Sequence, residues 1–167
     1  MVNILLSNPT HSQSASHMAR ILIADDDELI AEIASEVLID AGHACGWVTS
    51  ADAAWTCVRH KRPDVLLLDQ DMPGESGLTL LRRLRQSSQL YDLPVIMFTA
   101  MTGPADEAQA IYAGAQDFIS KPFDPLDLIA RVNRLIALRG DRPRHVDIAA
   151  ALFAEPAPAE PAVRRVI

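Results

Sequence analysis

The chain has 167 residues, 49% hydrophobic and 22% charged, a composition typical of a soluble globular domain with its own core. The net charge of −7 disfavours direct DNA binding, and no apolar run reaches the roughly 18 residues of a membrane-spanning helix. The two cysteines, Cys45 and Cys57, lack the spacing of zinc ligands, so we expect reduced thiols. The first residues lack a secretory signal pattern, so we expect a cytoplasmic protein without membrane contact.

Three segments are expected. Residues 1–18 are polar and rich in turn formers ahead of a second methionine, and we interpret them as a disordered leader outside the fold. Residues 19–140 carry the regular apolar pattern of one domain. Residues 141–167 are rich in Ala and Pro, which is typical of a flexible tail, and their pattern predicts no output domain.

The first part of the domain alternates strands with helices. Residues 21–24 predict a strand that must stop at the acidic run 25–28, because a strand cannot bury consecutive acids. A helix follows as far as Gly42, and a weaker strand over 44–49 is placed near a sheet edge because Gly46 interrupts it. The apolar residues at helical spacing are Ile30, Ile33, Val37, Leu38 and Ala41. Ser50 caps a second helix over 51–60, with Trp55 and Val58 as expected core contacts.

The stretch Val65-Leu66-Leu67-Leu68 is the expected centre of the sheet. Four apolar residues without a polar interruption predict a strand buried on both faces, the kind found in parallel sheets with helices on each side. Asp69 ends this strand, and residues 72–77 form a turn. The next helix, 78–84, and the residue after it carry three arginines that we expect to be solvated, namely Arg82, Arg83 and Arg85.

The last part of the domain adds two strands and two helices. Residues 94–98 predict a second buried strand ending at Thr99, and 117–120 predict a fifth strand ending at Lys121. Between them, 104–112 form a helix with few apolar anchors, which is expected to fray, to move or to meet a partner. Asp124 caps a last helix that runs to Gly140. Its predicted buried stripe comprises Leu126, Ile129, Val132, Leu135 and Ile136.

Five strands alternating with five helices predict an α/β fold with a doubly wound parallel sheet. The carboxyl ends of parallel strands share one edge, and the polar residues at these ends are Asp25, Asp26, Asp69, Thr99 and Lys121. Clustered carboxylates repel one another unless a cation lies among them, and an oxygen-only set suits Mg²⁺, with Mn²⁺ as the alternative. A lysine and a hydroxyl nearby suit a phosphoryl group, and the central aspartate is the natural acceptor. Singly, each residue also has a structural explanation, such as complementing a helix dipole.

These motifs resemble the receiver domain of two-component response regulators over about residues 19–139. The segments that carry the resemblance are 21–26, 63–69, 72–74, 94–100, 113–115 and 121–123. The resemblance implies a flavodoxin-like (βα)5 fold with strand order 2-1-3-4-5. It further implies a receiver that takes part in a two-component phosphorelay, and we expect it to stand alone because the pattern of the last segment predicts no output domain.

The resemblance also implies a role for each site residue. Asp69 matches the phosphoacceptor, Asp26 a direct Mg²⁺ ligand with Asp25 beside it, and Asp71 a ligand through its backbone carbonyl. The phosphoryl oxygens would be held by Thr99, Lys121 and the Ala100 backbone, and Lys121–Pro122 would be a cis peptide. Phe118 matches the switch aromatic that is coupled to Thr99, and it lacks the hydroxyl of a tyrosine. Asp71 and Met101 occupy positions that tune the lifetime of the phosphoryl group.

The implied partners are a histidine kinase or histidine phosphotransfer protein and a downstream protein bound through 104–112, 117–120 and the last helix. We expect a monomer or weak dimer with no enzymatic activity beyond its own phosphorylation and slow autodephosphorylation. Two alternatives stay open. Asp69-Gln70-Asp71 matches the Asp-x-Asp of haloacid-dehalogenase phosphatases, although Pro73 stands where that family has Thr or Val. The second alternative is an adaptor of receiver fold that works without phosphorylation.

Overall fold

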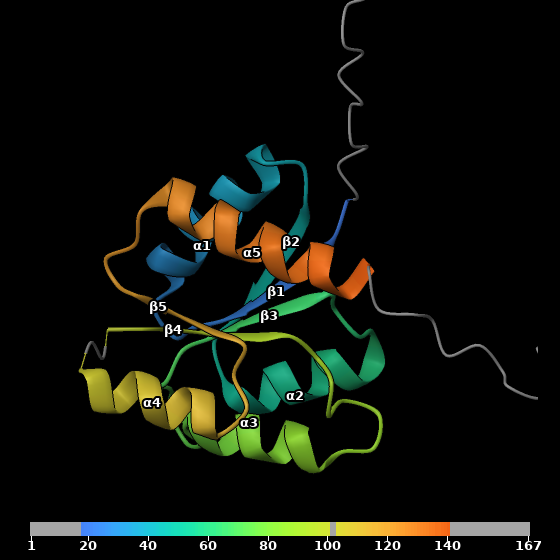
Figure 1. Cartoon of the computed structure of the whole chain (residues 1–167), viewed down its shortest axis with the longest axis vertical. Coiled ribbons are helices and arrows are strands. Elements are labelled where there is room, and N and C mark those ends of the chain that lie inside the picture. Colours follow the sequence, from blue (N-terminus) through green and yellow to red (C-terminus); the bar gives the residue numbers. More distant parts are fainter. Residues whose placement is uncertain (1–17, 101–102, 141–167) are drawn as a thin grey trace, which may run out of the picture.

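The computed structural model describes residues 18–100 and 103–140. The predictions for the leader over 1–17, for Met101 and for the tail over 141–167 lie outside the described residues. Five strands and five helices alternate along the chain (Figure 1). They are β1 (Arg20–Ala24), α1 (Glu28–Asp40), β2 (Ala44–Val48), α2 (Ala51–His60), β3 (Val65–Leu68), α3 (Gly77–Gln86), β4 (Val95–Thr99), α4 (Pro104–Tyr112), β5 (Asp117–Ser120) and α5 (Pro125–Gly140).

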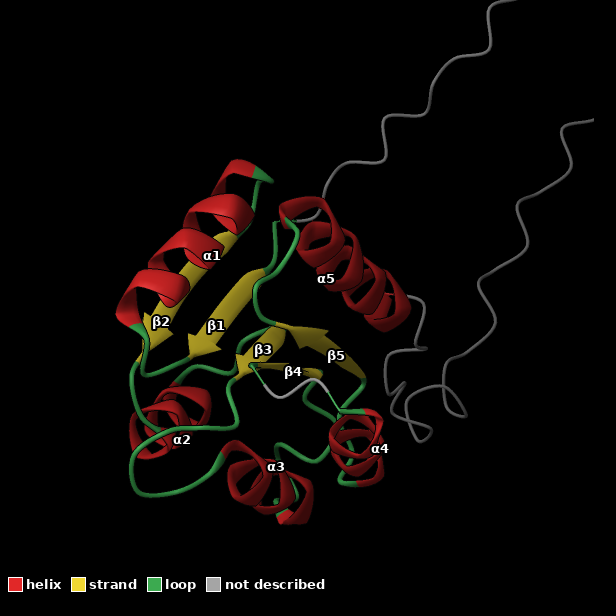
Figure 2. Cartoon of the chain, turned by 90° about the vertical axis from the view of Figure 1, so that its left-hand side faces the viewer, coloured by secondary structure: helices red, strands yellow, loops and turns green. Residues whose placement is uncertain are grey.

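The five strands form one parallel sheet in the order β2-β1-β3-β4-β5. Helices α1 and α5 cover one face and α2, α3 and α4 cover the other (Figure 2). The predicted fold class and strand order are therefore confirmed. Among the helices of the described residues, none has the length and apolar character needed to cross a membrane.

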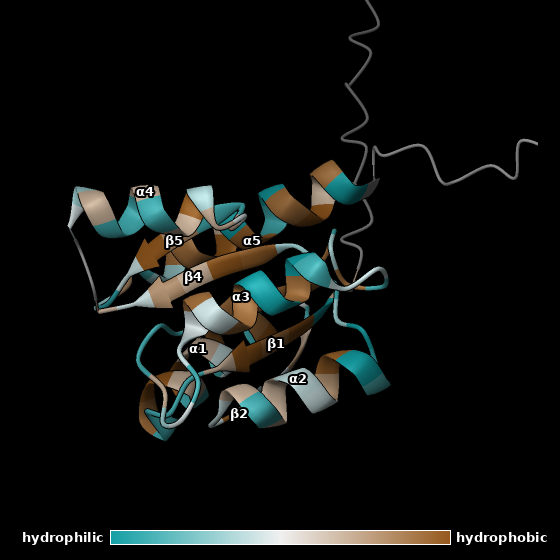
Figure 3. Ribbon diagram, turned by 90° about the horizontal axis from the view of Figure 1, so that it is seen from below, coloured by the Kyte–Doolittle hydropathy of each residue, from teal (hydrophilic) through white to brown (hydrophobic). Residues whose placement is uncertain are grey.

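The burial of the strands follows their position in the sheet. All four residues of β3 are buried, as are all five of β4, because these strands have neighbours on both sides and helices above and below. β2 lies at an edge, and three of its five residues are exposed, as the interruption by Gly46 predicted. The hydropathy colours show the same arrangement, with mostly apolar strands at the centre and helices of alternating polar and apolar residues around them (Figure 3).

Side chains cap the helices where the sequence predicted it. The Ser50 hydroxyl accepts a hydrogen bond from the Ala53 N–H at 3.2 Å, and the Asp124 carboxylate accepts one from the Asp127 N–H at 2.9 Å. Asp27, the third acid of the run after β1, caps α1 by accepting from the Ile30 N–H at 3.2 Å. The first helix therefore begins inside the acidic run, which leaves Asp25 and Asp26 before it.

The predicted buried face of α5 was wrong in part, and the buried face of α1 differs from its set of apolar residues at helical spacing. Leu126 is 76% exposed, whereas Leu128 is fully buried and starts the stripe that continues through Val132 and Leu135. Leu126 stands in the first turn of α5, ahead of the point where the helix packs on the sheet. In α1, Ile33 is 41% exposed, and the buried face is made of Ala31, Ala34, Ser35 and Leu38, mostly small side chains that allow close approach to the sheet.

The prediction that Arg85 is solvated was also wrong. Its guanidinium donates from Nε and Nη2 to the Gly114 carbonyl, at 2.9 and 2.7 Å, and from Nη1 to the Leu93 carbonyl at 2.9 Å. Burial lowers the pKa of this arginine. The side chain joins α3 to the corner between α4 and β5, where Gly114 adopts a φ of 102°. A β-carbon on Gly114 would lie 2.9 Å from the Arg85 Nε, so this corner is shaped around the arginine.

Candidate functional site

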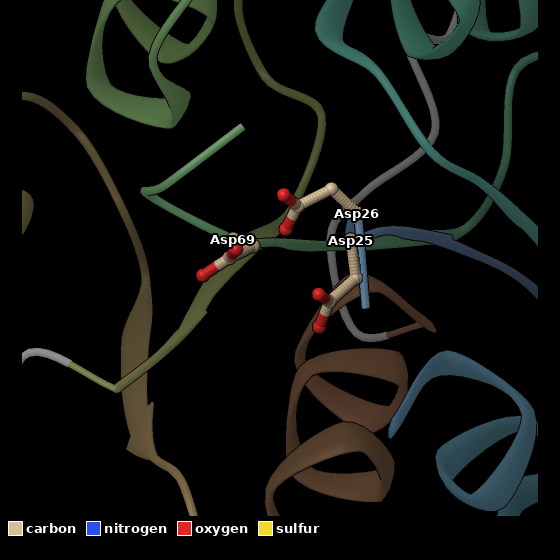
Figure 4. A group of neighbouring side chains, drawn as sticks. All are labelled: Asp25, Asp26 and Asp69. Carbon is tan, nitrogen blue, oxygen red and sulfur yellow. The ribbon is translucent and has the colours of Figure 1, made fainter. Parts of the chain in front are cut away.

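Three carboxylates gather at the carboxyl ends of β1 and β3. Ala24 pairs with Leu68 in the sheet, so the residues that follow them, Asp25 and Asp69, emerge side by side. Oxygens of Asp25, Asp26 and Asp69 all lie within 4.8 Å of one another (Figure 4). Asp25 is fully buried and Asp69 is 4% exposed, whereas Asp26 is exposed. The cluster thus has a buried floor and one carboxylate open to solvent.

Lys121 brings an ammonium group to this cluster from the end of β5. Its Nζ lies 2.5 Å from the Asp25 Oδ2 and 3.5 Å from the Asp69 Oδ1. The side chain is only 12% exposed, and Nζ lies 5.0 Å from the centroid of the Phe98 ring. The backbone N–H of Lys121 donates to the Thr99 carbonyl at 2.9 Å, which ties the lysine to the end of β4. The Lys121–Pro122 peptide is cis, as the resemblance implied.

Burial raises the pKa of Asp69 above its ordinary value of 3.8, and the negative charge of Asp25 raises it further. The Lys121 ammonium acts in the opposite direction, as do the backbone N–H groups of Gln70 and Asp71. The Gln70 N–H donates to the Asp69 Oδ1 at 2.8 Å, so this acceptor oxygen is held in place by the loop that follows it. Asp69 is therefore a buried carboxylate in a field of competing charges.

The donor set fits a hard divalent cation. Among the described residues, three carboxylates face the ammonium group of Lys121, which leaves surplus negative charge at the cluster. All the acidic ligand atoms are oxygens, which Mg²⁺ and Mn²⁺ prefer, and Asp26 is open to the water that Mg²⁺ usually retains. The exposed carboxylate of Asp71 does not join the cluster, which is compatible with a ligand role for its backbone alone.

The remaining predicted residues, apart from Asp71, belong to β4, to β5 and to the position after β4. Thr99 ends β4 and is 1% exposed, and Ala100 follows it as an exposed residue. Phe118 is partly buried in β5 and packs against the core beneath α2, α3 and α4. Thr99 and Phe118 line one small cavity, which is also bordered by Gln70, Leu78, Met97, Asp106, Gln109 and Ala110. The two predicted switch residues therefore share a space next to α4.

The sequence model of the response regulator receiver domain matches residues 21–133. The chain belongs to this family. The phosphate regulon transcriptional regulatory protein PhoB of Pseudomonas aeruginosa is 37% identical over 120 residues, which are 72% of this chain and 52% of that protein. The DNA-binding response regulator MtrA of Mycolicibacterium paratuberculosis is 39% identical over 124 residues, which are 74% of this chain and 54% of that protein.

Among solved structures, the chemotaxis response regulator CheY4 of Vibrio cholerae superposes with a TM-score of 0.67 at 30% identity, covering 71% of this chain and 98% of that one. The match therefore includes almost the whole of that neighbour. By contrast, the chain spans about half the length of the curated relatives PhoB and MtrA, at 52% and 54%.

Two residues of the receiver site were missed by sequence reasoning. A β-carbon on Gly77 would lie 2.0 Å from the Asp69 carbonyl oxygen, so only glycine fits where α3 begins. The Gln70 side-chain oxygen accepts from the Leu78 N–H at 2.9 Å, which closes the loop between β3 and α3. Gly77 had been assigned only to a turn, and no local pattern marks Gln70.

Proposed function

We propose that this receiver accepts a phosphoryl group on Asp69 from a phosphohistidine, with Mg²⁺ bound beside it. The donor would be a histidine kinase or a histidine phosphotransfer protein, and the protein would be cytoplasmic. The observation that carries the proposal is the position of Asp69, a buried carboxylate with two others within 4.8 Å and an ammonium 3.5 Å away. An acceptor carboxylate, a cation site and a lysine are the parts that phosphoryl transfer to aspartate needs.

In the proposed reaction, an Asp69 carboxylate oxygen forms a new bond to phosphorus while the phosphorus–nitrogen bond of the donor breaks. The imidazole leaves with the electron pair and takes up a proton. Asp25, Asp26, Asp69 and the Asp71 carbonyl would hold Mg²⁺, which would supply positive charge to the phosphoryl oxygens. Lys121 is already paired with Asp69 at 3.5 Å and would pair with a phosphoryl oxygen, and the Thr99 hydroxyl and Ala100 N–H would bind the others.

Phosphorylation would act as a switch through the cavity that Thr99 and Phe118 share. It adds roughly two negative charges at Asp69 and draws the Thr99 hydroxyl toward them. Phe118, which lines the same cavity, would then change its side-chain position together with Thr99. The conformational populations of α4, β5 and α5 would shift with this side chain. A downstream protein would bind the face formed by these elements.

We propose a docking output for the described domain, with a monomer or weak dimer as the working form. PhoB and MtrA are named as a transcriptional regulator and a DNA-binding regulator, but about half of each lies outside the match. The net charge of −7 disfavours DNA as a direct partner of this chain. Beyond its own phosphorylation and slow autodephosphorylation, we propose no enzymatic activity.

The proposal is tested with acetyl phosphate as a small donor in the presence of Mg²⁺. Wild type should gain one phosphoryl group by intact mass, and Asp69→Asn should gain none, because an amide cannot form the acyl phosphate. Asp117→Asn is the matched control, since Asp117 is also buried, at 8% exposure, but lies at the start of β5. Equal uptake by wild type and Asp69→Asn would refute the assignment of the acceptor.

Two outcomes would favour the alternatives. Multiple turnover on a simple phosphomonoester would indicate a phosphatase of the haloacid dehalogenase type, because a receiver should stop at the acyl phosphate. Equal affinity of the free and beryllofluoride-treated forms for a captured partner would indicate an adaptor that works without phosphorylation. A change in affinity on beryllofluoride treatment that is lost in Asp69→Asn would support the switch.

A further inference from the structure

Three side chains form a stack beside the acceptor loop. The Arg83 guanidinium of α3 lies 4.0 Å from the centroid of the Trp55 ring of α2. The same guanidinium donates from Nη1 to the Glu75 Oε2 at 2.7 Å. Glu75 belongs to the loop between β3 and α3, the loop that starts directly after Asp69. The stack therefore links this loop to two helices.

The base of this loop is fixed on β3. The Gly77 N–H donates to the Gln70 carbonyl at 3.0 Å, and the Leu78 N–H donates to the Gln70 side chain at 2.9 Å. Gly77 also lies against the Asp69 carbonyl, so the two ends of the loop lie close together. Residues 71–75 form the crown of the loop, and their position depends on what holds the crown.

Two side chains of the crown contact the rest of the protein. Met72 is 8% exposed and belongs to the same core cluster against which Trp55 packs. Glu75, whose side chain is 18% exposed, binds Arg83. An arginine stacked on a ring loses freedom before it binds a carboxylate, and its charged hydrogen bond is strengthened by partial burial. The crown is therefore held on one side by packing and on the other by a fixed ion pair.

We propose that Trp55, Arg83 and Glu75 are positioning residues for the cation site. By holding the crown, they fix the Asp71 backbone next to the carboxylate cluster and so set the affinity for the divalent cation and the rate of phosphoryl uptake. The inference rests on the proposed function, because it assumes that the Asp71 carbonyl is a ligand. Groups that orient the ligands of a metal commonly control its affinity.

The charges of the stack allow a sharp test. If the residues acted only through space, loss of the Glu75 charge would weaken cation binding and loss of the Arg83 charge would strengthen it. A positioning role predicts weaker binding for both, and also for a Trp55 variant that changes no charge. The variants are Glu75→Gln, Arg83→Met and Trp55→Leu, with Arg83→Lys as the conservative variant and Arg82→Met as the control, since Arg82 is the exposed neighbour on α3.

Binding is measured as the loss of the free Mn²⁺ signal in electron paramagnetic resonance, and phosphoryl uptake from acetyl phosphate is measured by intact mass. We expect the first three variants to bind Mn²⁺ about 3- to 10-fold more weakly, and to recover normal uptake at excess Mg²⁺. Arg83→Lys should recover part of the affinity, and Arg82→Met should match wild type. Urea unfolding verifies that each variant is folded.

The proposal is overturned if Arg83→Met binds Mn²⁺ as tightly as Arg82→Met or more tightly, whatever the stability of the variants. The Mn²⁺ titration tests the positioning role even if wild type takes up no phosphoryl group. Absence of phosphoryl uptake alone would refute the proposed function and not the positioning role. Wild type that binds no Mn²⁺ would overturn the positioning role directly.

Discussion

At the scale of single residues, the balance of charge around Asp25 and Asp69 dominates the site. Both carboxylates are almost completely buried, and Lys121 is the cation that contacts them both among the described residues. A buried charge that loses its partner is costly, because neither water nor another charge compensates for it. The lysine therefore supports the fold as well as the proposed reaction.

Lys121→Met should lower the free energy of unfolding by about 3–5 kcal/mol in the absence of divalent cations, because it leaves the two buried carboxylates without an ammonium. Millimolar Mg²⁺ should restore part of the loss by binding between them. Urea denaturation with and without Mg²⁺ measures both effects. In the control Arg134→Met, which removes a 62%-exposed partner of Asp117, we expect a loss of about 0–1 kcal/mol. Equal losses in the two variants would contradict the prediction.

The sequence predicted the site residues because strand ends are local features. Asp25 and Asp69 follow apolar runs directly, and Asp26 comes next after Asp25. The rule that parallel strands share a carboxyl edge brings the three together. Gly77, Gln70 and Arg85 were missed or misjudged because their roles depend on contacts with distant carbonyls and amides. A composition or spacing rule contains no information on which carbonyl a side chain will reach.

At the scale of secondary-structure elements, α4 is the least anchored of the helices on its face of the sheet. In α4 one residue, Ala110, is buried. In α3 four residues are buried, namely Gly77, Leu80, Leu81 and Leu84. Ile111 and Tyr112 are 47% and 95% exposed. The sparse apolar pattern of 104–112 had indicated this, because a helix without a stripe of large apolar residues has little to bury.

Hydrogen exchange should therefore distinguish α4 from α3. We expect the backbone amides of α4 to exchange about tenfold faster or more, because opening this helix exposes little apolar surface. Helix α3 is a suitable reference, with 10 residues against 9 and a position on the same face of the sheet. Mass spectrometry of peptic peptides resolves the two helices. Equal protection of both would show that α4 is anchored by something other than side-chain burial.

The existence and order of the elements followed from sequence, whereas the phase of two helices did not. Leu126 was expected to be buried, yet it is 76% exposed. Ile33, one of the apolar residues at helical spacing in α1, is 41% exposed. Helical spacing defines a stripe but not which of two adjacent stripes faces the sheet. In α1, alanines occupy the buried stripe because the helix lies close to the strands, a distance that no local pattern encodes.

At the scale of the whole molecule, the sheet separates two apolar cores. One lies between the sheet and α1 with α5, and includes Ile23, Phe98 and Val132. The other lies beneath α2, α3 and α4, and includes Leu66, Leu81 and Met97. The acceptor site lies at the edge where both cores end. Changes of charge at this site therefore alter the free energy of unfolding of the entire domain.

The free energy of unfolding should therefore depend on pH through Asp69. The folded state holds the Asp69 proton more tightly than the unfolded chain does, since burial raises the pKa above 3.8. The contribution of Asp69 to wild-type stability falls as the pH rises from 3.8 through the folded-state pKa, and remains lowered above it. Asp69→Asn lacks this penalty, so without divalent cations it should be more stable than wild type near neutral pH.

This margin should narrow as the pH falls toward 3.8, where the unfolded chain also binds the proton. Urea denaturation of the two proteins over a series of pH values, in the presence of a chelator, measures the margin. Mg²⁺ should reduce it at neutral pH, because the cation stabilises the wild-type carboxylate. A margin that stays constant with pH would show that Asp69 carries no such penalty.

The contacts of Arg85 have a consequence for how receivers of this kind diverge. This side chain of α3 holds the carbonyl of Gly114 at the end of α4 and that of Leu93 before β4. A substitution in α3 would therefore move the face proposed to meet the downstream protein without altering any residue of that face. Two receivers with identical α4, β5 and α5 sequences can then select different partners, and comparison of their contact residues alone would not reveal why.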